Sequence, residues 1–385
     1  MPGGPSVYFV VLLSVLANTG LRGSRVLVSL TALHLGANSL MVGVLAALFS
    51  VFPLVLAVYA GRVSDRVGVR VPIALGAAGM TLGLLLPGLH EGFLTLIACP
   101  ALIGLGQIFL QVSIQNAVGS IGGADARAGN FGTFSLGASV STFIGPSLAG
   151  FAIDAVGFRP TYFVLAAMPL AVVLLALSFG HRMPARGGHG EERGEGRALD
   201  LLKEAPLRRT LFMSGVALTG IELFSFYMPI YGRSIGLSAS GIGLVLSAYA
   251  GAAFVVRLVM HSLARRFSET GVLTASLFVA ASTYALFPLL TGVPMLVLTA
   301  FLLGLGLGSA QPLTIMLTYH HAPEGRSGEA LGMRLTVNKI TQISIPIVFG
   351  GIGTLFGLAP VFWANAAFLF AGGALAVRES RESSA

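Results

Sequence analysis

The chain has 385 residues, of which 55% are hydrophobic and only 10% are charged. Soluble globular proteins carry about 25% charged residues, so this composition excludes a water-soluble enzyme of this length. The hydrophobicity also excludes a disordered chain, and the single cysteine, Cys99, excludes a disulfide-stabilised secreted fold. The formal net charge of +8 is large for so apolar a chain, so the positions of the charges are informative.

Twelve apolar segments are long enough to cross a membrane, which takes about 20 residues for about 30 Å of hydrocarbon. The first segment is predicted to be a span and not a cleaved signal peptide, because no Lys or Arg precedes Val7 and the apolar run is too long. In chain order the predicted spans cover residues 7–33, 41–60, 71–88, 93–117, 129–153, 160–180, 210–231, 241–260, 271–290, 294–319, 328–354 and 360–377.

The polar stretch between the sixth and seventh spans is rich in Gly, Arg and Glu. It predicts three parts: an N-terminal six-helix bundle at 1–180, a cytoplasmic linker at 181–209 and a C-terminal six-helix bundle at 210–385. The expected fold class is an all-α membrane protein.

The loop charges predict the orientation of these spans, since Lys and Arg accumulate on the cytoplasmic side. With both termini inside, sixteen Lys and Arg residues fall in cytoplasmic segments, and two, Arg159 and Arg233, fall in outer loops. We therefore expect a multi-pass protein of the cell (inner) membrane with both termini in the cytoplasm.

The two halves of the chain resemble one another at an offset of 200 residues. Thr19-Gly20 matches Thr219-Gly220, Leu102 and Gly104 to Gly106 match Leu302 and Gly304 to Gly306, and Gln111 matches Gln311. Gly and Pro dominate these matches, but the register runs ungapped over some 150 positions. Because six spans separate the copies, the repeats are parallel, which predicts two pseudo-symmetric bundles.

The loop after the second span carries a motif of a known family. Residues 61–70 read Gly-Arg-Val-Ser-Asp-Arg-Val-Gly-Val-Arg, which resembles the G-x-x-x-D-R-x-G-R-R signature of the major facilitator superfamily, with Val69 replacing one basic residue. The resemblance implies the major facilitator fold and a gating role for the motif residues Gly61, Asp65, Arg66, Gly68 and Arg70. The alternative, a simple positive-inside stop, explains the arginines but not the acid and the glycines.

The fifth span resembles the antiporter signature of the export branch of that family. Gly132, Gly145, Pro146 and Gly150 fit the signature, and the resemblance implies a gating role for Gly145 and Pro146. Close helix packing by small residues is the alternative. The basic residue of many drug/proton antiporters is absent from the fourth span, where Pro100 stands, so coupling through that residue is in doubt.

Six charged residues lie well inside the predicted spans, where each central charge costs about 2.5–3.5 kcal/mol on insertion scales. This cost indicates that they face a wet interior or one another. Arg257, near the inner end of its span, is expected to be a gate or to snorkel to the interface. The six are Arg22, Arg25, Arg257, Arg334, Lys339 and Glu222.

Glu222 is the candidate proton site, because intramembrane acids mark proton pathways. Its repeat partner is Arg22, about 16 Å into the first span at 1.5 Å per residue. Arg22 and Glu222 are therefore the candidates for proton coupling, and a permanent salt bridge joining the halves is the alternative. Nearby aromatic residues, including Tyr227, would stack on a substrate or pack in the core.

Polar residues recur every fourth position in two spans, as helices that line an aqueous cavity require. Gln107, Gln111 and Gln115 form one stripe, and Arg334, Asn338 and Gln342 form another beside Lys339. Inter-helix hydrogen bonding is the alternative for Arg334 and Lys339. The expected substrate-binding residues are Arg22, Arg25, Gln107, Gln111, Tyr227, Gln311, Arg334, Asn338 and Lys339.

These features predict a secondary active transporter and not an enzyme. We expect a proton-coupled exporter of a small amphipathic substrate with an anionic group, working by alternating access. The alternatives are a broad-specificity multidrug/proton antiporter and, less favoured, a membrane receptor or intramembrane enzyme. The expected partners are the substrate, protons and the lipid bilayer, and the expected state is a monomer. No zinc spacing, cofactor motif or aromatic-flanked basic patch predicts a metal, a cofactor or nucleic-acid binding.

Overall fold

The structure is a computed structural model that describes residues 6–180, 183–184, 198–323 and 326–382. The described residues form helices and no β-strand. The first half contains α1 Val7–His34, α2 Ser39–Val67, α3 Arg70–Leu89, α4 Phe93–Ser120, α5 Gly123–Val156 and α6 Phe158–Ser178. The second half contains α7 Ala205–Ser234, α8 Ala239–Phe267, α9 Glu269–Leu286, α10 Val293–Leu307, α11 Ala310–His320, α12 Ser327–Phe356 and α13 Leu358–Glu382, with short 3-10 helices η2 Ala198–Lys203 and η3 Phe287–Leu289.

Within the described residues, twelve helical segments are long and apolar enough to cross a membrane, which confirms the predicted all-α membrane architecture. Most of the predicted linker lies outside the described residues. Its last part differs from the expectation, because η2 occupies Ala198–Lys203 and α7 begins at Ala205, five residues before the predicted start of that span.

The chain divides into two compact units. Unit 1 comprises Met1–Ala37, Val44–Gly190 and Gly236–Ser247, and unit 2 comprises Asn38–Gly43, Glu191–Ile235 and Ala248–Ala385. The units follow the two halves of the sequence except that the first residues of α2 belong to unit 2 and those of α8 to unit 1.

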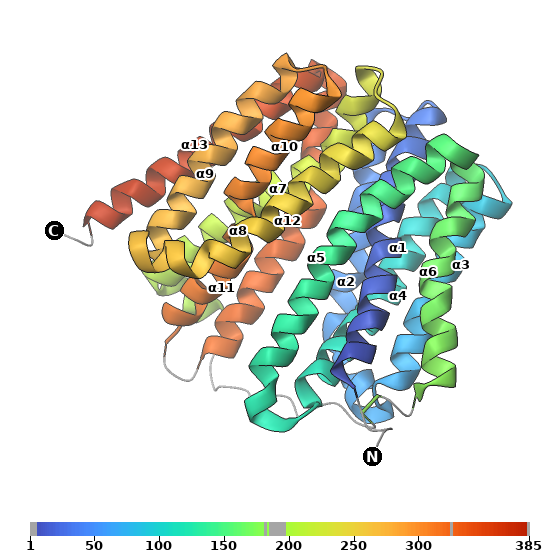
Figure 1. The fold of residues 1–385 in the computed structure, drawn as a ribbon. Helices are drawn as coiled ribbons and strands as arrows, with labels where there is room; N and C mark the ends of the chain where they lie inside the picture. The colour runs from blue at the N-terminus through green and yellow to red at the C-terminus, as the bar shows by residue number, and fades with distance from the viewer. Residues whose placement is uncertain (1–5, 181–182, 185–197, 324–325, 383–385) are drawn as a thin grey trace. The chain divides into compact units, whose positions relative to one another are not determined.

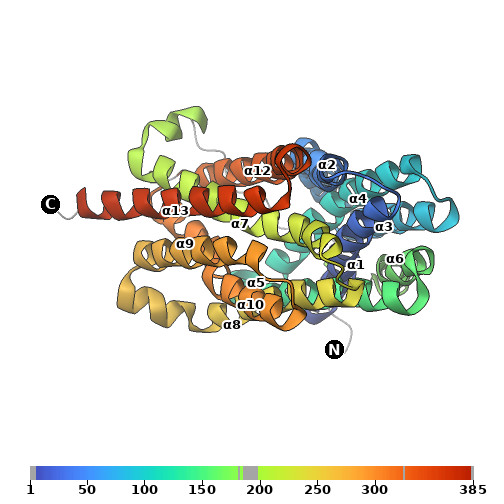
Figure 2. The same cartoon turned by 90° about the horizontal axis from the view of Figure 1, so that it is seen from above.

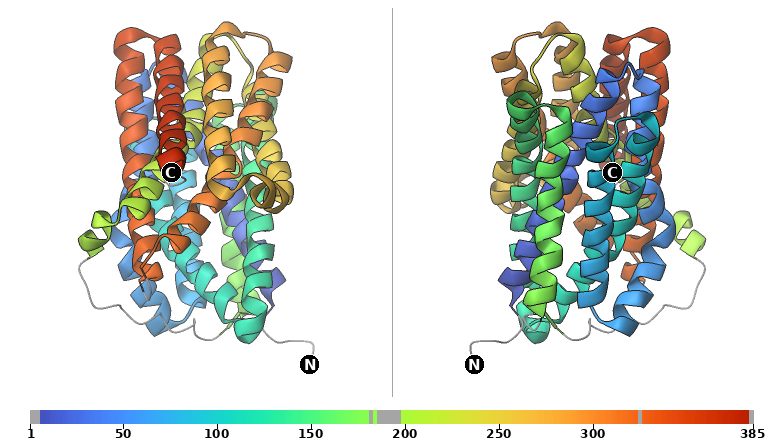
Figure 3. Two further views of the ribbon diagram at one scale, coloured as in Figure 1. Left: turned by 90° about the vertical axis from the view of Figure 1, so that its left-hand side faces the viewer. Right: turned by 90° about the vertical axis from the view of Figure 1, so that its right-hand side faces the viewer.

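The same helix pairs contact one another in each unit. In unit 1, α1 packs against α4, α5 and α6, and α3 packs between α4 and α6 (Figure 1). In unit 2, α7 packs against α11, α12 and α13, and α9 packs against α10 and α13. Figures 2 and 3 show the helices of each unit running side by side over much of their length.

The helix ends follow the 200-residue offset of the sequence. α2 and α8 begin at Ser39 and Ala239, and α5 and α12 end at Val156 and Phe356. The glycines that follow α5 and α12, Gly157 and Gly357, both have φ of 86°, a conformation that L side chains rarely adopt.

Glycine also allows close helix crossings at matched positions. A Cβ atom on Gly104 would lie 2.8 Å from the carbonyl oxygen of Phe49, and one on Gly304 would clash with the carbonyl oxygen of Tyr249. The glycines of the fourth span and of its repeat therefore serve helix packing.

The tenth predicted span is interrupted, whereas its repeat partner α4 is continuous. α10 ends at Leu307 and α11 begins at Ala310. Pro312 has no N–H, so it cannot donate to the carbonyl of Gly308 four residues earlier. Arg257 of α8 supplies the missing donor, since its Nε donates to the Gly308 oxygen at 3.0 Å. At the position of Pro312, α4 carries Val112 and needs no such donor.

Each unit receives the first turn of a helix from the other half of the sequence. In unit 1 the Asp154 carboxylate of α5 accepts hydrogen bonds from the backbone N–H groups of Ala239 (3.2 Å) and Ser240 (2.8 Å) at the start of α8. In unit 2, Thr354 of α12 accepts one from the N–H of Leu40 at 3.1 Å. The two contacts are 200 residues apart and satisfy N–H groups that a helix leaves unpaired at its start.

Candidate functional site

The intramembrane cations of unit 1 lie on α1. Arg22 is half-buried, and a Cβ atom on Gly145 of α5 would lie 2.6 Å from its Cβ. Arg25 is half-buried one turn further on, with its guanidinium carbon 5.6 Å from the centre of the Phe49 ring. A cation over an aromatic face is stabilised by the ring quadrupole, so the structure places Arg25 against α2.

Glu222 lies on α7 in unit 2 with 9% of its surface exposed. The facing helix is α12, where Ser214 donates to the Asn338 side chain at 3.2 Å and Gly215 faces Thr341. The two residues of the first pair are 124 positions apart in the chain, and those of the second pair are 126 apart. At the same spacing, Glu222 of α7 lies level with Pro346 of α12. Glu222 is thus buried at the level of Pro346, which corresponds in the repeat to Pro146 of the antiporter signature.

Arg334 of α12 is almost fully buried, with 3% exposure, and binds α11. Its Nη2 donates to the Thr314 hydroxyl at 3.0 Å, to the Gln311 side-chain oxygen at 3.0 Å and to the Gln311 backbone oxygen at 3.2 Å, while its Nε lies 3.3 Å from the Thr314 hydroxyl. Together with Arg257, it attaches two neighbouring helices to the segment where the tenth span is interrupted.

Part of the hydrogen bonding of the two predicted polar stripes is made within each helix. Gln107 donates to Gln111 at 3.4 Å along α4, and Lys339 donates to Gln342 at 3.0 Å along α12. Gln107, Gln111 and Lys339 are half-buried. They therefore keep part of their surface accessible, in contrast to Arg334.

Tyr227 is fully buried in the aromatic core of unit 2. Its ring centroid lies 5.7 Å from that of Phe226 and 5.5 Å from that of Phe362, and its hydroxyl fits against Gly353. In this state it has no surface to offer a ligand, so we place it in the core and leave it out of the substrate set.

The motif between α2 and α3 has one clear partner in unit 1. Gly68 has φ of 85° and forms the turn, and Arg66 is exposed. Arg70 donates from Nε and Nη2 to the carbonyl oxygens of Ala176 (3.1 Å) and Leu177 (2.6 Å), near the C-terminal end of α6. A cation is stabilised there by the unpaired carbonyls and the helix dipole.

The two other motif residues are Gly61 and Asp65. Gly61 lies half-buried on α2, and a Cβ atom there would approach Val112 only to 4.0 Å. The side chain of Asp65 lies outside the described residues.

The antiporter-like motif of α5 packs against α1. A Cβ atom on Gly137 would lie 2.7 Å from Val11, and Ser141 donates to the Val15 carbonyl at 3.1 Å. Gly145 continues this face to Arg22, and the carbonyl of Pro146 contacts Gly243 of α8. The small residues of this motif therefore permit close helix contacts on two sides.

The interrupted tenth span was not predicted from the sequence, although Pro312 within an apolar run was the available signal. Two parallel six-helix repeats and charges inside the spans indicate a membrane transporter.

The comparison with known families agrees with this class. The family model described as Major Facilitator Superfamily matches residues 7–266 and 210–384. The chain belongs to the Major Facilitator Superfamily. It is a transporter and not an enzyme, and a multi-pass protein of the inner membrane.

Similar proteins are named for multidrug resistance. The chain is 23% identical over 332 residues to Multidrug resistance protein MdtG of Enterobacter lignolyticus, which covers 84% of this chain and 78% of that protein. It is 25% identical over 326 residues to Multidrug resistance protein 1 of Bacillus subtilis, covering 83% and 81%.

Solved transporter structures share the fold at low sequence identity. The peptide transporter POT in complex with sulfate has a TM-score of 0.81 at 14% identity, covering 99% of this chain and 97% of that one. The nucleoside transporter NupG has a TM-score of 0.81 at 14% identity, covering 97% and 99%. These similarities concern the fold alone.

Proposed function

We propose that this transporter exports amphipathic organic compounds in exchange for protons by alternating access, with Glu222 as the proton-binding group. Its similarity to proteins named for multidrug resistance supports a broad range of amphipathic substrates. The proposed orientation has both termini in the cytoplasm, which the sixteen-to-two distribution of loop cations supports.

The observation that carries the proton assignment is the position of Glu222. Glu222 is the acid that lies well inside a span, whereas Asp154, Glu269 and Glu329 lie at or near span ends. It is buried on α7 at the level of Pro346. An acid kept within a membrane span at this cost is best explained by a proton that it binds and releases during transport.

A preference for anionic substrates is the second candidate, and the excess of intramembrane cations favours it. The structure supports different contributions from these cations. Arg334 is buried and its Nε and Nη2 donate to Gln311 and Thr314, whereas Arg22 and Lys339 retain accessible surface. We propose that Arg22 and Lys339, with Gln107 and Gln111, contact the substrate, and that Arg334 positions α11.

The gating assignments are also proposals. Arg70 joins the α2–α3 turn to α6, and Arg257 joins α8 to the interrupted tenth span. Such contacts between a side chain and a helix end can form and break when helices move, so each suits a gate.

The test is transport by the purified protein in proteoliposomes with an imposed pH gradient. The Glu222→Gln variant keeps the size of the side chain but cannot bind and release a proton. We expect gradient-driven accumulation of a fluorescent amphipathic compound to be lost, while exchange of labelled for unlabelled compound without a gradient persists.

The matched control is Glu204→Gln, the same substitution at an exposed acid beside the start of α7. It should transport like the unaltered protein. Retention of gradient-driven accumulation by Glu222→Gln would refute the proton assignment. Comparing anionic with neutral amphipathic compounds in the same vesicles tests the substrate preference.

A further inference from the structure

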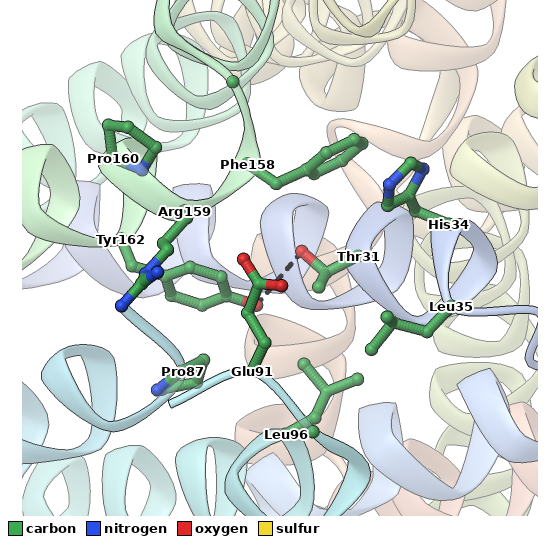
Figure 4. A pocket seen from close by; sticks show the side chains of 12 residues that line it. Thr31, His34, Leu35, Pro87, Glu91, Leu96, Phe158, Arg159, Pro160 and Tyr162 are labelled. Carbon is green, nitrogen blue, oxygen red and sulfur yellow. Dashed lines mark hydrogen bonds between the residues drawn. The ribbon is translucent and has the colours of Figure 1, made fainter. Parts of the chain in front are cut away.

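A cavity of about 360 Å³ opens in unit 1 where α1 ends and α4 and α6 begin (Figure 4). It lies at the ends of the membrane spans formed by these helices, which is the level of the membrane surface. Its volume lies within the range of small-molecule sites, about 300–1,000 Å³. None of the proposed substrate-binding or proton-coupling residues lines it.

Two opposite charges line this cavity without bonding to one another. Glu91, just before α4, directs its carboxylate into the cavity and makes no ion pair with a described residue (Figure 4). Arg159, at the start of α6, donates from Nε and Nη2 to the carbonyls of Gly88 (2.8 Å) and Leu89 (2.9 Å). Its Nη1 makes no hydrogen bond within the described part of the chain. Arg159 is held by the end of α3, and both charges remain able to bind a ligand.

The rest of the lining combines aromatic and polar surfaces. His34 stacks on Phe158 with ring centroids 4.8 Å apart, and Tyr162 donates to the Thr31 hydroxyl at 3.1 Å. The Tyr162 hydroxyl is thereby satisfied, which leaves the two charged side chains as the principal groups for an incoming ligand.

The same place in unit 2 is filled. At the 200-residue offset, Thr31 corresponds to Tyr231, Pro87 to Phe287 and Tyr162 to Phe362. The ring of Phe362 lies 5.1 Å from that of Tyr231 and 5.6 Å from that of Phe287, and the Tyr231 hydroxyl donates to the Phe287 and Leu290 carbonyls. The fold therefore accommodates packed aromatic rings at this point, and the cavity lies where Thr31 and Pro87 stand in place of the larger Tyr231 and Phe287.

The charges are also specific to unit 1. Glu91 corresponds to Thr291, and Arg159 corresponds to Ala359. The repeat in which aromatic rings pack at this place thus lacks both charges, whereas the repeat with the cavity has both. Unit 2 forms the same helix contacts without either charge. Arg159 bonds the carbonyls at the end of α3, where Tyr231 bonds carbonyls at the matching place in unit 2, whereas Glu91 has no such role among the described residues.

We propose that this cavity is a second ligand site, separate from the transport pathway, for a zwitterion that carries a primary ammonium and a phosphate or carboxylate group. Glu91 binds the ammonium, and Arg159 binds the anionic group through Nη1. The stacked His34 and Phe158 rings cover the body of the ligand. This chemistry is shared by a free phosphoethanolamine-like zwitterion and by the headgroup of an aminophospholipid.

Binding to the detergent-purified full-length chain tests the proposal, with O-phosphoethanolamine as the probe. Ethylamine and inorganic phosphate serve as probes with one charged group each. A hydrogen bond to a charged group corresponds to about 10- to 150-fold in affinity. We therefore expect O-phosphoethanolamine to bind at least about 10-fold more tightly than ethylamine or inorganic phosphate. Equal affinity for ethylamine and the zwitterion would overturn the assignment.

Variants taken from the other repeat identify the site. Glu91→Thr and Thr31→Tyr introduce the residues of unit 2, and Arg159→Gln keeps a donor for the α3 carbonyls without the charge. Each should weaken zwitterion binding by about tenfold or more. Arg233→Ala, at an exposed arginine near the end of α7, should leave it unchanged. Unchanged binding in all three site variants would overturn the proposal.

A lipid arm separates the two sources of the ligand. The protein is placed in nanodiscs of phosphatidylethanolamine or of phosphatidylglycerol, and retained lipid is measured by native mass spectrometry. Selective retention of phosphatidylethanolamine that is lost in Glu91→Thr supports a lipid headgroup as the ligand, and binding of O-phosphoethanolamine alone supports a soluble one. Failure of both to bind would overturn the proposal. None of these measurements depends on proton coupling.

Discussion

The contact between Arg334 and α11 allows the energetic cost of a buried charge to be tested. Thr314→Val removes the hydroxyl that accepts from Nε and Nη2 but leaves the guanidinium buried at 3% exposure. Arg334→Met removes the charge itself and keeps most of the side-chain volume. Both changes delete this pair of hydrogen bonds, and Arg334→Met also deletes the two that Nη2 makes with Gln311.

The expected magnitudes differ in consequence. Hydrogen bonds to charged groups contribute about 1.5–3 kcal/mol in proteins, and those measured within membranes average about 0.6. Since one oxygen accepts both bonds, we expect Thr314→Val to lower the free energy of unfolding by about 1–3 kcal/mol. Arg334→Met also relieves a charge that costs about 2.5–3.5 kcal/mol on insertion scales, so its net effect should lie within about 1 kcal/mol of zero.

The partners left by Arg334→Met can satisfy one another. The Thr314 hydroxyl already donates to the Gln311 carbonyl at 3.0 Å, so removal of the guanidinium leaves it bonded. In the Arg334→Met background, the cost of Thr314→Val should therefore fall by about 1–2 kcal/mol, a coupling that a double-mutant cycle measures.

The assay is reversible unfolding in mixed micelles followed by tryptophan fluorescence. Trp363 is the one tryptophan of the chain and lies on α13 in unit 2, where its indole N–H is 3.3 Å from the Ala285 carbonyl. It therefore reports on the unit that contains Arg334. An Arg334→Met variant that is less stable than Thr314→Val by more than about 2 kcal/mol would refute the reasoning, because the guanidinium would then be net stabilising.

Two further predictions concern packing and pH. Gly106→Leu places a side chain against the carbonyl of Gly76 and should destabilise unit 1 by about 3 kcal/mol or more. The measurement is the rate at which a thiol reagent labels the buried Cys99, which should increase. An unchanged labelling rate would contradict this prediction. Burial, with His320 as a smaller cause, lowers the pKa of His321 below its usual value of 6.5. As the pH drops, the unfolded chain therefore binds a proton at this histidine before the folded chain does. The free energy of unfolding should then fall as the pH drops from about 7.5 to 5.5. His321→Asn, which can still bond Thr210, should reduce that fall, and an equal fall in both proteins would show that His321 does not cause it.

The membrane architecture was predictable because it depends on quantities that a sequence displays directly. Apolar length determines a span, and a repeated register determines a repeated fold. The correspondence extends to helix ends, as Ser39 and Ala239 show. Glycines at matched positions, Gly104 and Gly304, also make matched contacts.

The interruption of the tenth span was harder to predict because it depends on a distant residue. Pro312 removes one donor, but a proline alone is tolerated in most of these helices. The outcome at Gly308 involves Arg257, more than fifty positions away in the chain. Sequence spacing does not show which carbonyl a distant arginine will reach.

The partners of the candidate site residues were likewise beyond sequence reasoning. The sequence left substrate contact and inter-helix hydrogen bonding open for Arg334, and its hydrogen bonds go to α11. It left substrate stacking and core packing open for Tyr227, and Phe226 and Phe362 enclose that ring. Periodicity identifies which residues share a face, and only the packing shows what covers that face.

The helix starts that each unit receives from the other half affect the order in which hydrogen bonds can form during synthesis. The N–H of Leu40 is bonded by Thr354, 314 residues later, whereas Asp154 waits only 86 residues for Ser240. At about 5–20 residues per second, the ribosome needs about 15–60 s to supply the partner of Leu40. Throughout that interval the N–H of Leu40 lacks this partner, while the N–H of Met41 already has the Asn38 side chain. A gene split between the halves would deprive each product of a segment that its own unit requires.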